Sequence, residues 1–236
     1  MISPWLIFFN LACCGVAAAA TVSGQVELVN SREASVRKQA DYSGVVVSLV
    51  PVHAGLHASP PRHLRMLQKN KMFHPHVLAA EVGSFVDFPN ADPIFHNAFS
   101  SFSGQIFDVG LYPPGKSRVV RFERPGIVRV FCNIHQLMSA VIVVVASPYF
   151  ATTNAKGTFS IEAPSGDYEL RVYHERATEE TLRALALPVH VGESGVALPP
   201  FRVSEAGYLP SPHKNKHGQD YPPPADERVF YPGVRN

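Results

Sequence analysis

The sequence lacks a large excess of either positive or negative charge. Its 236 residues carry 21 Lys and Arg against 19 Asp and Glu, a formal net charge of +2. So small an excess gives no basis for nucleic acid or an acidic membrane surface as the partner. The sequence also lacks a Gly-rich phosphate loop, an H-E-x-x-H zinc motif and a nucleophile elbow. We therefore predict that the protein is not an enzyme and does not bind nucleic acid.

The first twenty residues contain no charged side chain at all. An apolar stretch leads into small residues that end in Ala18-Ala19-Ala20, which is the order of a secretory signal with an A-x-A cleavage site. We predict a cleaved signal over residues 1–20, export to the periplasm and no stable membrane insertion afterwards. Because the start lacks Lys and Arg, a retained membrane anchor stays open as an alternative, although the apolar stretch is short for a span. A second alternative is a lipid on Cys13 or Cys14, which follow Leu11-Ala12.

Cysteine is scarce, with three in the whole chain, and loss of the signal would leave Cys132 alone. A lone cysteine cannot form an internal disulfide. In an oxidising compartment its thiol is a liability unless it is buried or bound to a metal. The surrounding segment, residues 132–138, reads CNIHQLM, so that Cys132, His135 and Met138 follow the spacing C-x2-H-x2-M.

This residue set indicates copper. Two imidazoles, one thiolate and a weak axial thioether suit an ion that cycles between Cu(I) and Cu(II). The heptapeptide holds one histidine, so the second must come from another strand end, and His96 in Phe95-His96-Asn97 is the natural donor. Plainer interpretations are a buried small Cys132 and a core Met138. A dinuclear copper centre needs two cysteines, and methionine is a poor ligand for structural zinc.

Most of the remaining chain alternates between β-branched runs and turns, so the predicted fold class is all-β. The expected strands cover 22–29, 44–50, 77–88 with a turn at 81–84, 117–122, 127–131, 140–146, 158–161 and 168–173. The continuously apolar run Ala140–Ala146 predicts a strand that is buried on both faces. Ala58–Lys71 and Glu175–Ala186 are the two stretches predicted to be helical.

From Val77 to Val145 the chain resembles a cupredoxin, the type 1 blue-copper fold. A strand and turn lead to His-Asn, and GIVRVFC-x2-H-x2-M then runs into a valine-rich strand. The C-x2-H-x2-M spacing matches the short ligand loop of amicyanin. The wider segment also resembles plastocyanin-like proteins labelled methylamine utilisation proteins. The resemblance implies a Greek-key β-sandwich over 63–146 with one copper ion, Cu(I) or Cu(II), held by His96, Cys132, His135 and Met138.

The same resemblance assigns roles around the ligands. It implies that Asn97 hydrogen-bonds across to the cysteine loop and restrains it. It also implies that the outer edge of His135 lies near the surface, where Leu137 and Pro93 contribute to an apolar patch. The departure is Gln136-Leu137, where amicyanin has proline and phenylalanine. His74 and His76 lie before the first strand of this region and form either an accessory site or a plain surface pair.

The flanking segments resemble two halves of one carboxypeptidase-regulatory-like, transthyretin-type sandwich. Neither half has enough strands to bury a core alone, and insertion of a domain at an exposed loop is tolerated. We therefore predict a discontinuous domain of residues 21–62 with 147–203, and an extended proline-rich tail over 204–236 without a core of its own. The alternative is a leading hairpin with a separate C-terminal module.

The leading functional hypothesis is a periplasmic one-electron carrier that docks transiently on protein redox partners. A second hypothesis is a copper-binding module for storage, delivery or sensing, without electron-transfer turnover. A third is an assembly or adhesion protein whose copper site is vestigial. Reversible reduction separates the first from the second, and more than one copper ion per chain would favour storage.

Overall fold

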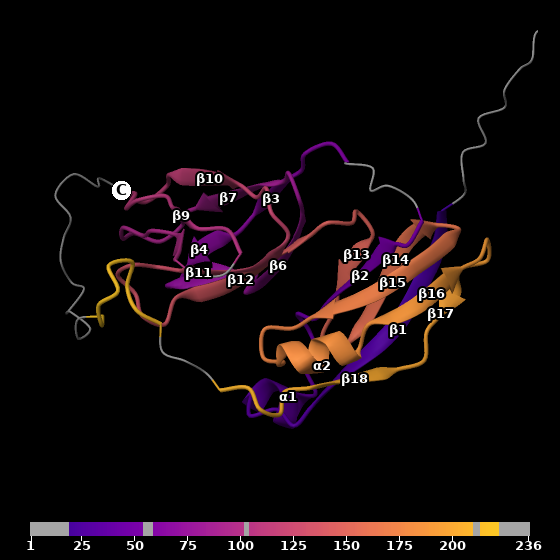
Figure 1. The fold of residues 1–236 in the computed structure, drawn as a ribbon. Coiled ribbons are helices and arrows are strands. Elements are labelled where there is room, and N and C mark those ends of the chain that lie inside the picture. Colours follow the sequence, from indigo (N-terminus) through magenta and orange to yellow (C-terminus); the bar gives the residue numbers. More distant parts are fainter. Residues whose placement is uncertain (1–18, 54–58, 102–103, 210–212, 222–236) are drawn as a thin grey trace, which may run out of the picture.

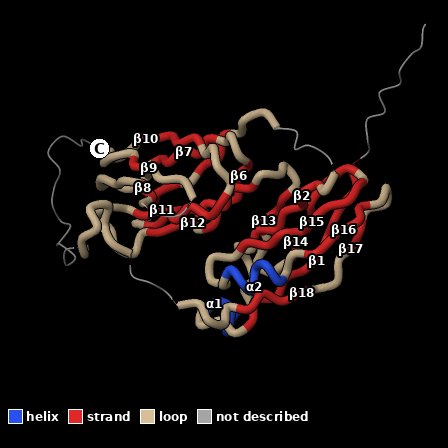
Figure 2. The backbone as a smooth tube through the Cα atoms, viewed as in Figure 1, coloured by secondary structure: helices blue, strands red, loops and turns tan. Residues whose placement is uncertain are grey.

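The computed structural model describes residues 19–53, 59–101, 104–209 and 213–221, which form two lobes built almost entirely from strands (Figure 1, Figure 2). The all-β prediction is confirmed. None of the helices in this part of the chain is long and apolar enough to cross a membrane. The predicted signal lies almost wholly outside the described residues and stays a prediction; its last two residues, Ala19 and Ala20, open the first strand.

The first lobe, here called the flanking lobe, draws its strands from both sides of the chain. One sheet has the order β14-β1-β17, with β18 also paired to β1, and the other has the order β13-β2-β15-β16. Its apolar core is filled by residues from 20–49 and 159–203. The elements are β1 (Ala19–Val29), α1 (Ala34–Gln39), β2 (Val46–Pro51), β13 (Phe150–Thr152), β14 (Thr158–Pro164), β15 (Gly166–Tyr173), α2 (Glu179–Ala184), β16 (Leu187–Val191), β17 (Val196–Ala197) and β18 (Phe201–Ser204).

The second lobe, here called the inserted lobe, lies between β2 and β13 in the chain. Its sheets have the orders β10-β7-β3 and β6-β12-β11-β8-β9, with a β4-β5 hairpin beside them. The strands are β3 (His63–Arg65), β4 (Leu67–Lys69), β5 (Met72–His74), β6 (Val77–Glu81), β7 (Phe85–Pro89), β8 (Phe99–Ser100), β9 (Phe107–Asp108), β10 (Ser117–Arg121), β11 (Gly126–Phe131) and β12 (Ser139–Val145). Its own core runs from Met66 to Val144. The assignment of domain boundaries and the kinship of the flanking lobe stay predictions.

Strand β12 lies between the two lobes and is buried on both faces, as its sequence predicted. Successive side chains of a strand point to opposite faces, so Ala140, Ile142 and Val144 face the core of the inserted lobe. The alternate valines pack with Val46 of β2 in a third apolar cluster. Burial of each such valine contributes about 1.5–3 kcal/mol relative to exposure. The turn that connects β11 to β12 therefore leads into a strand that is buried on both faces.

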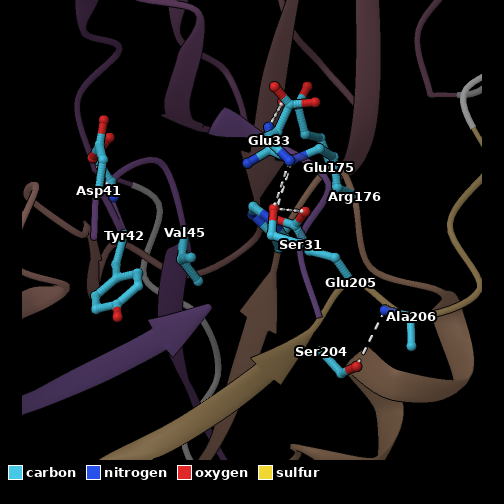
Figure 3. Close-up of polar contacts among 12 residues, drawn as sticks. Ser31, Glu33, Asp41, Tyr42, Val45, Glu175, Arg176, Ser204, Glu205 and Ala206 are labelled. Carbon is cyan, nitrogen blue, oxygen red and sulfur yellow. Dashed lines mark hydrogen bonds and ion pairs between the residues drawn. The ribbon is translucent and has the colours of Figure 1, made fainter. Parts of the chain in front are cut away.

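A polar cluster joins the lobes beside this apolar contact. His76 of the inserted lobe contacts the Glu175 carboxylate through Nε2 at 3.0 Å. Arg176 donates to Glu175 at 2.7 Å and to Glu205 at 3.0 Å, and Ser31 donates to the second oxygen of Glu205 at 2.6 Å. Figure 3 shows Ser31, Glu175, Arg176 and Glu205 gathered together. His76 thus belongs to the contact between the lobes and not to a free surface pair.

The helix predictions need one correction. Ala58–Lys71 is not helical: from residue 59 onward it forms β3 and β4, because His63–Arg65 pairs in parallel with Phe85–Asp87 of β7. Met66 and Gln68 are both fully buried, which is the alternation of a strand. Within Glu175–Ala186 the helix is confirmed as the shorter α2, which the Thr178 hydroxyl caps by accepting from the Thr181 N–H. The six-residue α1, with only Val36 buried, was missed.

Candidate metal centre

Two loops at one end of the inserted lobe carry the predicted ligands. His96 lies between β7 and β8, where its backbone pairs with Tyr112 through hydrogen bonds of 3.2 and 2.9 Å. Cys132 follows the last residue of β11, and His135 and Met138 lie in the turn from β11 to β12. The segment 132–138, here called the ligand loop, is thus the connection between two paired central strands. Its ends are fixed by that antiparallel ladder.

Three of the four predicted ligands converge. The Nδ1 atoms of His96 and His135 are 3.1 Å apart, and Cys132 Sγ lies 3.8 Å from His96 Nδ1 and 3.5 Å from His135 Nδ1. Donor atoms that share an ion at about 2.0–2.3 Å lie about 3–4 Å from one another. The observed separations therefore fit one common ion. Among the described residues this is the group of His, Cys and acidic side chains with metal-binding geometry.

Met138 is fully buried in the same apolar cluster as Cys132. Its carbonyl accepts from the Cys132 N–H at 3.0 Å, and its N–H donates to the His135 carbonyl at 3.0 Å. These bonds close the ligand loop into a compact turn and place Met138 on the core side. Its role as the axial thioether stays a prediction.

Asn97 connects the His96 segment to the ligand loop, as the resemblance implied. Its Oδ1 accepts from the Asn133 N–H at 3.2 Å, and its Nδ2 donates to Asp108 at 2.7 Å. Because Asn97 is fully buried, both bonds replace contacts with water. The residue after the first histidine thus restrains the residue after the cysteine.

Asp92 is a site residue that the sequence analysis missed. Its carboxylate lies 2.8 Å from His96 Nε2 and accepts from the N–H groups of Asn70 and Lys71. A carboxylate oxygen accepts, so Nε2 carries the proton and Nδ1 presents a lone pair to His135 and Cys132. The available signal was the turn Pro89–Pro93, which places an acid four residues before the histidine.

The protonation of the ligands follows from burial. Burial lowers the pKa of His135 to about 4 and also lowers the pKa of His96, although Asp92 acts in the opposite direction. Both imidazoles are therefore neutral at pH 7. Burial would raise the pKa of Asp92, but the hydrogen bonds from Lys71, His96 and Asn70 outweigh it and hold that pKa low. The candidate site therefore contains two neutral imidazoles, one of which donates a hydrogen bond to the charged Asp92 carboxylate.

The thiol of Cys132 is different, because burial raises its pKa and three backbone N–H groups only partly offset that rise. Without a cation the group is a protonated thiol. A metal ion reverses this balance, since a coordinating thiol is deprotonated. Converging lone pairs and a buried thiol are what a soft cation stabilises, so the residues fit copper.

The outer side of the ligand loop reaches the surface. His135 is half-buried, and Leu137 is 93% exposed. Pro93 in the neighbouring loop is also exposed. The His135 side chain is therefore closer to solvent than Cys132 and His96, which are both fully buried. The apolar patch of Leu137 and Pro93 stays a prediction.

Comparisons with known proteins give structural likeness only. No family model matches the chain, and no curated protein does. A Cu-containing nitrite reductase from Thermus scotoductus is 26% identical over 40% of this chain, with a TM-score of 0.35; the match covers 25% of that enzyme. A purple cupredoxin from Nitrosopumilus maritimus is 21% identical over 35% of this chain and 99% of its own, with a TM-score of 0.33. A reduced amicyanin variant is 15% identical over 43% of this chain and 99% of its own, with a TM-score of 0.34.

The expected likeness to cupredoxins is thus confirmed among solved structures, over part of the chain. The observation that indicates a metal site is the convergence of donor atoms from His96, Cys132 and His135. The nitrite reductase is an enzyme of which this chain spans a quarter.

Proposed function

We propose that the protein is a periplasmic type 1 copper protein that carries single electrons between redox partners. The observation that carries this proposal is the convergence of His96 Nδ1, His135 Nδ1 and Cys132 Sγ, all within 4.8 Å of one another at the end of a buried β-sandwich. Met138 completes the ligand set from the core side of the loop. Export rests on the predicted signal over 1–20.

The donor set supports copper in two oxidation states. Thiolate and thioether sulfur favour Cu(I), and imidazole nitrogen accommodates both states. When bound, copper supplies one-electron chemistry by alternating between Cu(I) and Cu(II). Cys132 would contribute by giving up its proton on binding. His96 would contribute by keeping its proton on Nε2, where it is donated to the Asp92 carboxylate, so that Nδ1 faces the metal.

The chain's own contribution is rigidity and exclusion of water. Asp92 fixes the ring of His96, Asn97 ties that segment to Asn133, and the ligand loop closes on itself through Cys132 and Met138. Ligands held in this way move little when the charge at the centre changes. Low reorganisation is what a carrier needs, whereas a storage site has no use for it.

The exposed side of the ligand loop supports transient docking. Leu137 and Pro93 offer a small apolar surface next to the half-buried His135. Weak redox encounters use small interfaces, below about 1,200 Å². We propose that a partner protein docks there and exchanges electrons at the His135 edge.

The experiment is to load the protein with copper, measure the metal content and titrate it with a reductant and then an oxidant. The proposal expects one copper ion per chain and a reversible one-electron couple over repeated cycles. More than one copper ion per chain, or a centre that loses its metal on reduction, would contradict the carrier and support storage or delivery.

A further inference from the structure

Residues 213–221, near the C-terminus, pack against the inserted lobe. Strand β18 ends at Ser204 in the flanking lobe, but residues 213–221 lie against the other lobe, beside β9 and β11 (Figure 1). The chain thus returns to the inserted lobe after completing the flanking one. The point at which it returns is the ligand loop.

Three hydrogen bonds join this segment to the ligand loop. The Tyr221 hydroxyl donates to the carbonyl of Cys132 at 2.8 Å. His213 Nε2 donates to the carbonyl of Gln136 at 2.6 Å, and the N–H of Lys216 donates to Asn133 Oδ1 at 2.9 Å. The contacts fall at the first, second and fifth of the seven loop residues, so they restrain the loop along most of its length.

Ring packing and an ion pair support these bonds. The ring of His213 stacks on Phe131 at 4.0 Å with an interplanar angle of 25°, and the ring of Tyr221 meets His213 edge-on at 5.2 Å. The ammonium of Lys216 lies 2.8 Å from Asp108. That same carboxylate holds Asn97, so the segment and Asn97 belong to one network around the ligand loop.

We propose that residues 213–221 form a clamp that holds the ligand loop in place, with Tyr221 as the positioning residue for Cys132. The cysteine backbone is then fixed on both sides, its N–H by Met138 and its carbonyl by Tyr221. The contacts of residues 213–221 with the ligand loop support the clamp by themselves. An effect of the clamp on copper binding rests on the proposed function.

The test uses amide hydrogen exchange in full-length, metal-free protein, comparing the wild type with Tyr221→Phe. Tyr168→Phe is the matched control, because the Tyr168 hydroxyl also donates to a backbone carbonyl at 2.8 Å, that of Pro164 in the flanking lobe. Loss of one hydrogen bond corresponds to about a three- to tenfold change in an opening equilibrium. We expect exchange in 132–138 to accelerate by that factor in Tyr221→Phe and to stay unchanged in Tyr168→Phe. Equal exchange in all three proteins would overturn the clamp.

A second variant distinguishes local loosening of the ligand loop from destabilisation of the whole fold. His213→Phe keeps a ring on Phe131 but removes the donor to Gln136, so exchange should again rise in the ligand loop while the β1 and β14 amides keep their wild-type rates. A rise in both places would show that these residues support the whole fold, and would count against a local clamp.

The copper measurement separates this inference from the proposed function. Release of Cu(I) to a coloured chelator should be about three- to tenfold faster in Tyr221→Phe than in Tyr168→Phe. If the wild type binds no copper, the proposed function fails while the exchange result still decides the clamp. Faster loop exchange with unchanged release would contradict the role of Tyr221 as the positioning residue for Cys132.

Discussion

Each lobe of the molecule contains one buried histidine paired with a carboxylate at 2.8 Å. In the inserted lobe the pair is His96 with Asp92, and in the flanking lobe it is His174 with Glu205. The difference lies in the second ring nitrogen. Nδ1 of His96 meets another imidazole and a thiol, whereas Nδ1 of His174 has no hydrogen-bond partner among the described residues. A buried histidine–carboxylate pair is therefore not a site by itself; convergent donors make it one.

The carboxylates differ in a similar way. Glu205 also binds Arg176 and Ser31, so it belongs to the cluster between the lobes. Burial would raise the pKa of Glu205, but the hydrogen bonds from His174 and Ser31 outweigh it and keep that pKa low. Asp92 instead accepts from two backbone N–H groups and orients one ring. We infer that the Glu205 pair stabilises the contact between the lobes, and that the Asp92 pair orients a ligand of the proposed metal site.

The largest expected effect on stability comes from Glu205→Gln. Removing this charge leaves Arg176 and the buried His174 without their common partner, which costs about 3 kcal/mol in the free energy of unfolding. Copper affinity should stay within about twofold of wild type. Chemical denaturation and copper titration measure the two quantities. Glu179→Gln is the control, since its pair with Arg183 is exposed on both sides and should cost less than about 0.5 kcal/mol.

The converse change is Asp92→Asn. The amide keeps the size but loses the charge that orients His96, so copper affinity should fall about tenfold. The free energy of unfolding should fall by about 1 kcal/mol, less than in Glu205→Gln. Competition with a chelator gives the affinity. If Asp92→Asn costs more stability than Glu205→Gln and leaves copper binding intact, the contrast between the two pairs is wrong.

A smaller effect concerns pH and the ion pair between the lobes. The hydrogen bond to Glu175 raises the pKa of His76 despite its partial burial. A raised folded-state pKa gives stability that is full below the unfolded pKa, about 6.5, and is lost as the pH rises through the folded value. The pair is half exposed on the His76 side, so screening limits this contribution to about 0.5 kcal/mol.

The corresponding measurement is the unfolding free energy of wild type and His76→Gln at pH 6 and pH 8. Wild type should lose up to about 0.5 kcal/mol more than the variant on raising the pH. The same slope in both proteins would mean that His76 does not stabilise the contact between the lobes.

Local sequence patterns were sufficient to predict the position of the ligand loop and the two-sided burial of β12. The spacing C-x2-H-x2-M needs only a turn between paired strands, and the run AVIVVVA needs only two apolar layers around one strand. The helix expected over Ala58–Lys71 failed because parallel pairing of β3 with β7 is a contact between distant segments. Such tertiary pairing overrides local propensity.

Two contacts around the candidate ligands could not be predicted from the sequence. Tyr221 lies 89 residues from Cys132, in a polar, proline-rich segment whose composition predicts no packing. Asp92 is only four residues from His96, yet its role depends on the turn that points the carboxylate at Nε2. Composition and periodicity cannot report either geometry.

The most direct measurement is the visible absorption spectrum of the full-length protein loaded with Cu(II), beside Cys132→Ala. We predict an intense blue thiolate-to-copper band in the wild type, which a mild reductant bleaches and an oxidant restores, and which the variant lacks. A pale spectrum that is the same in both proteins would contradict a type 1 site, and His96, Cys132 and His135 would then be a buried polar cluster without a copper function.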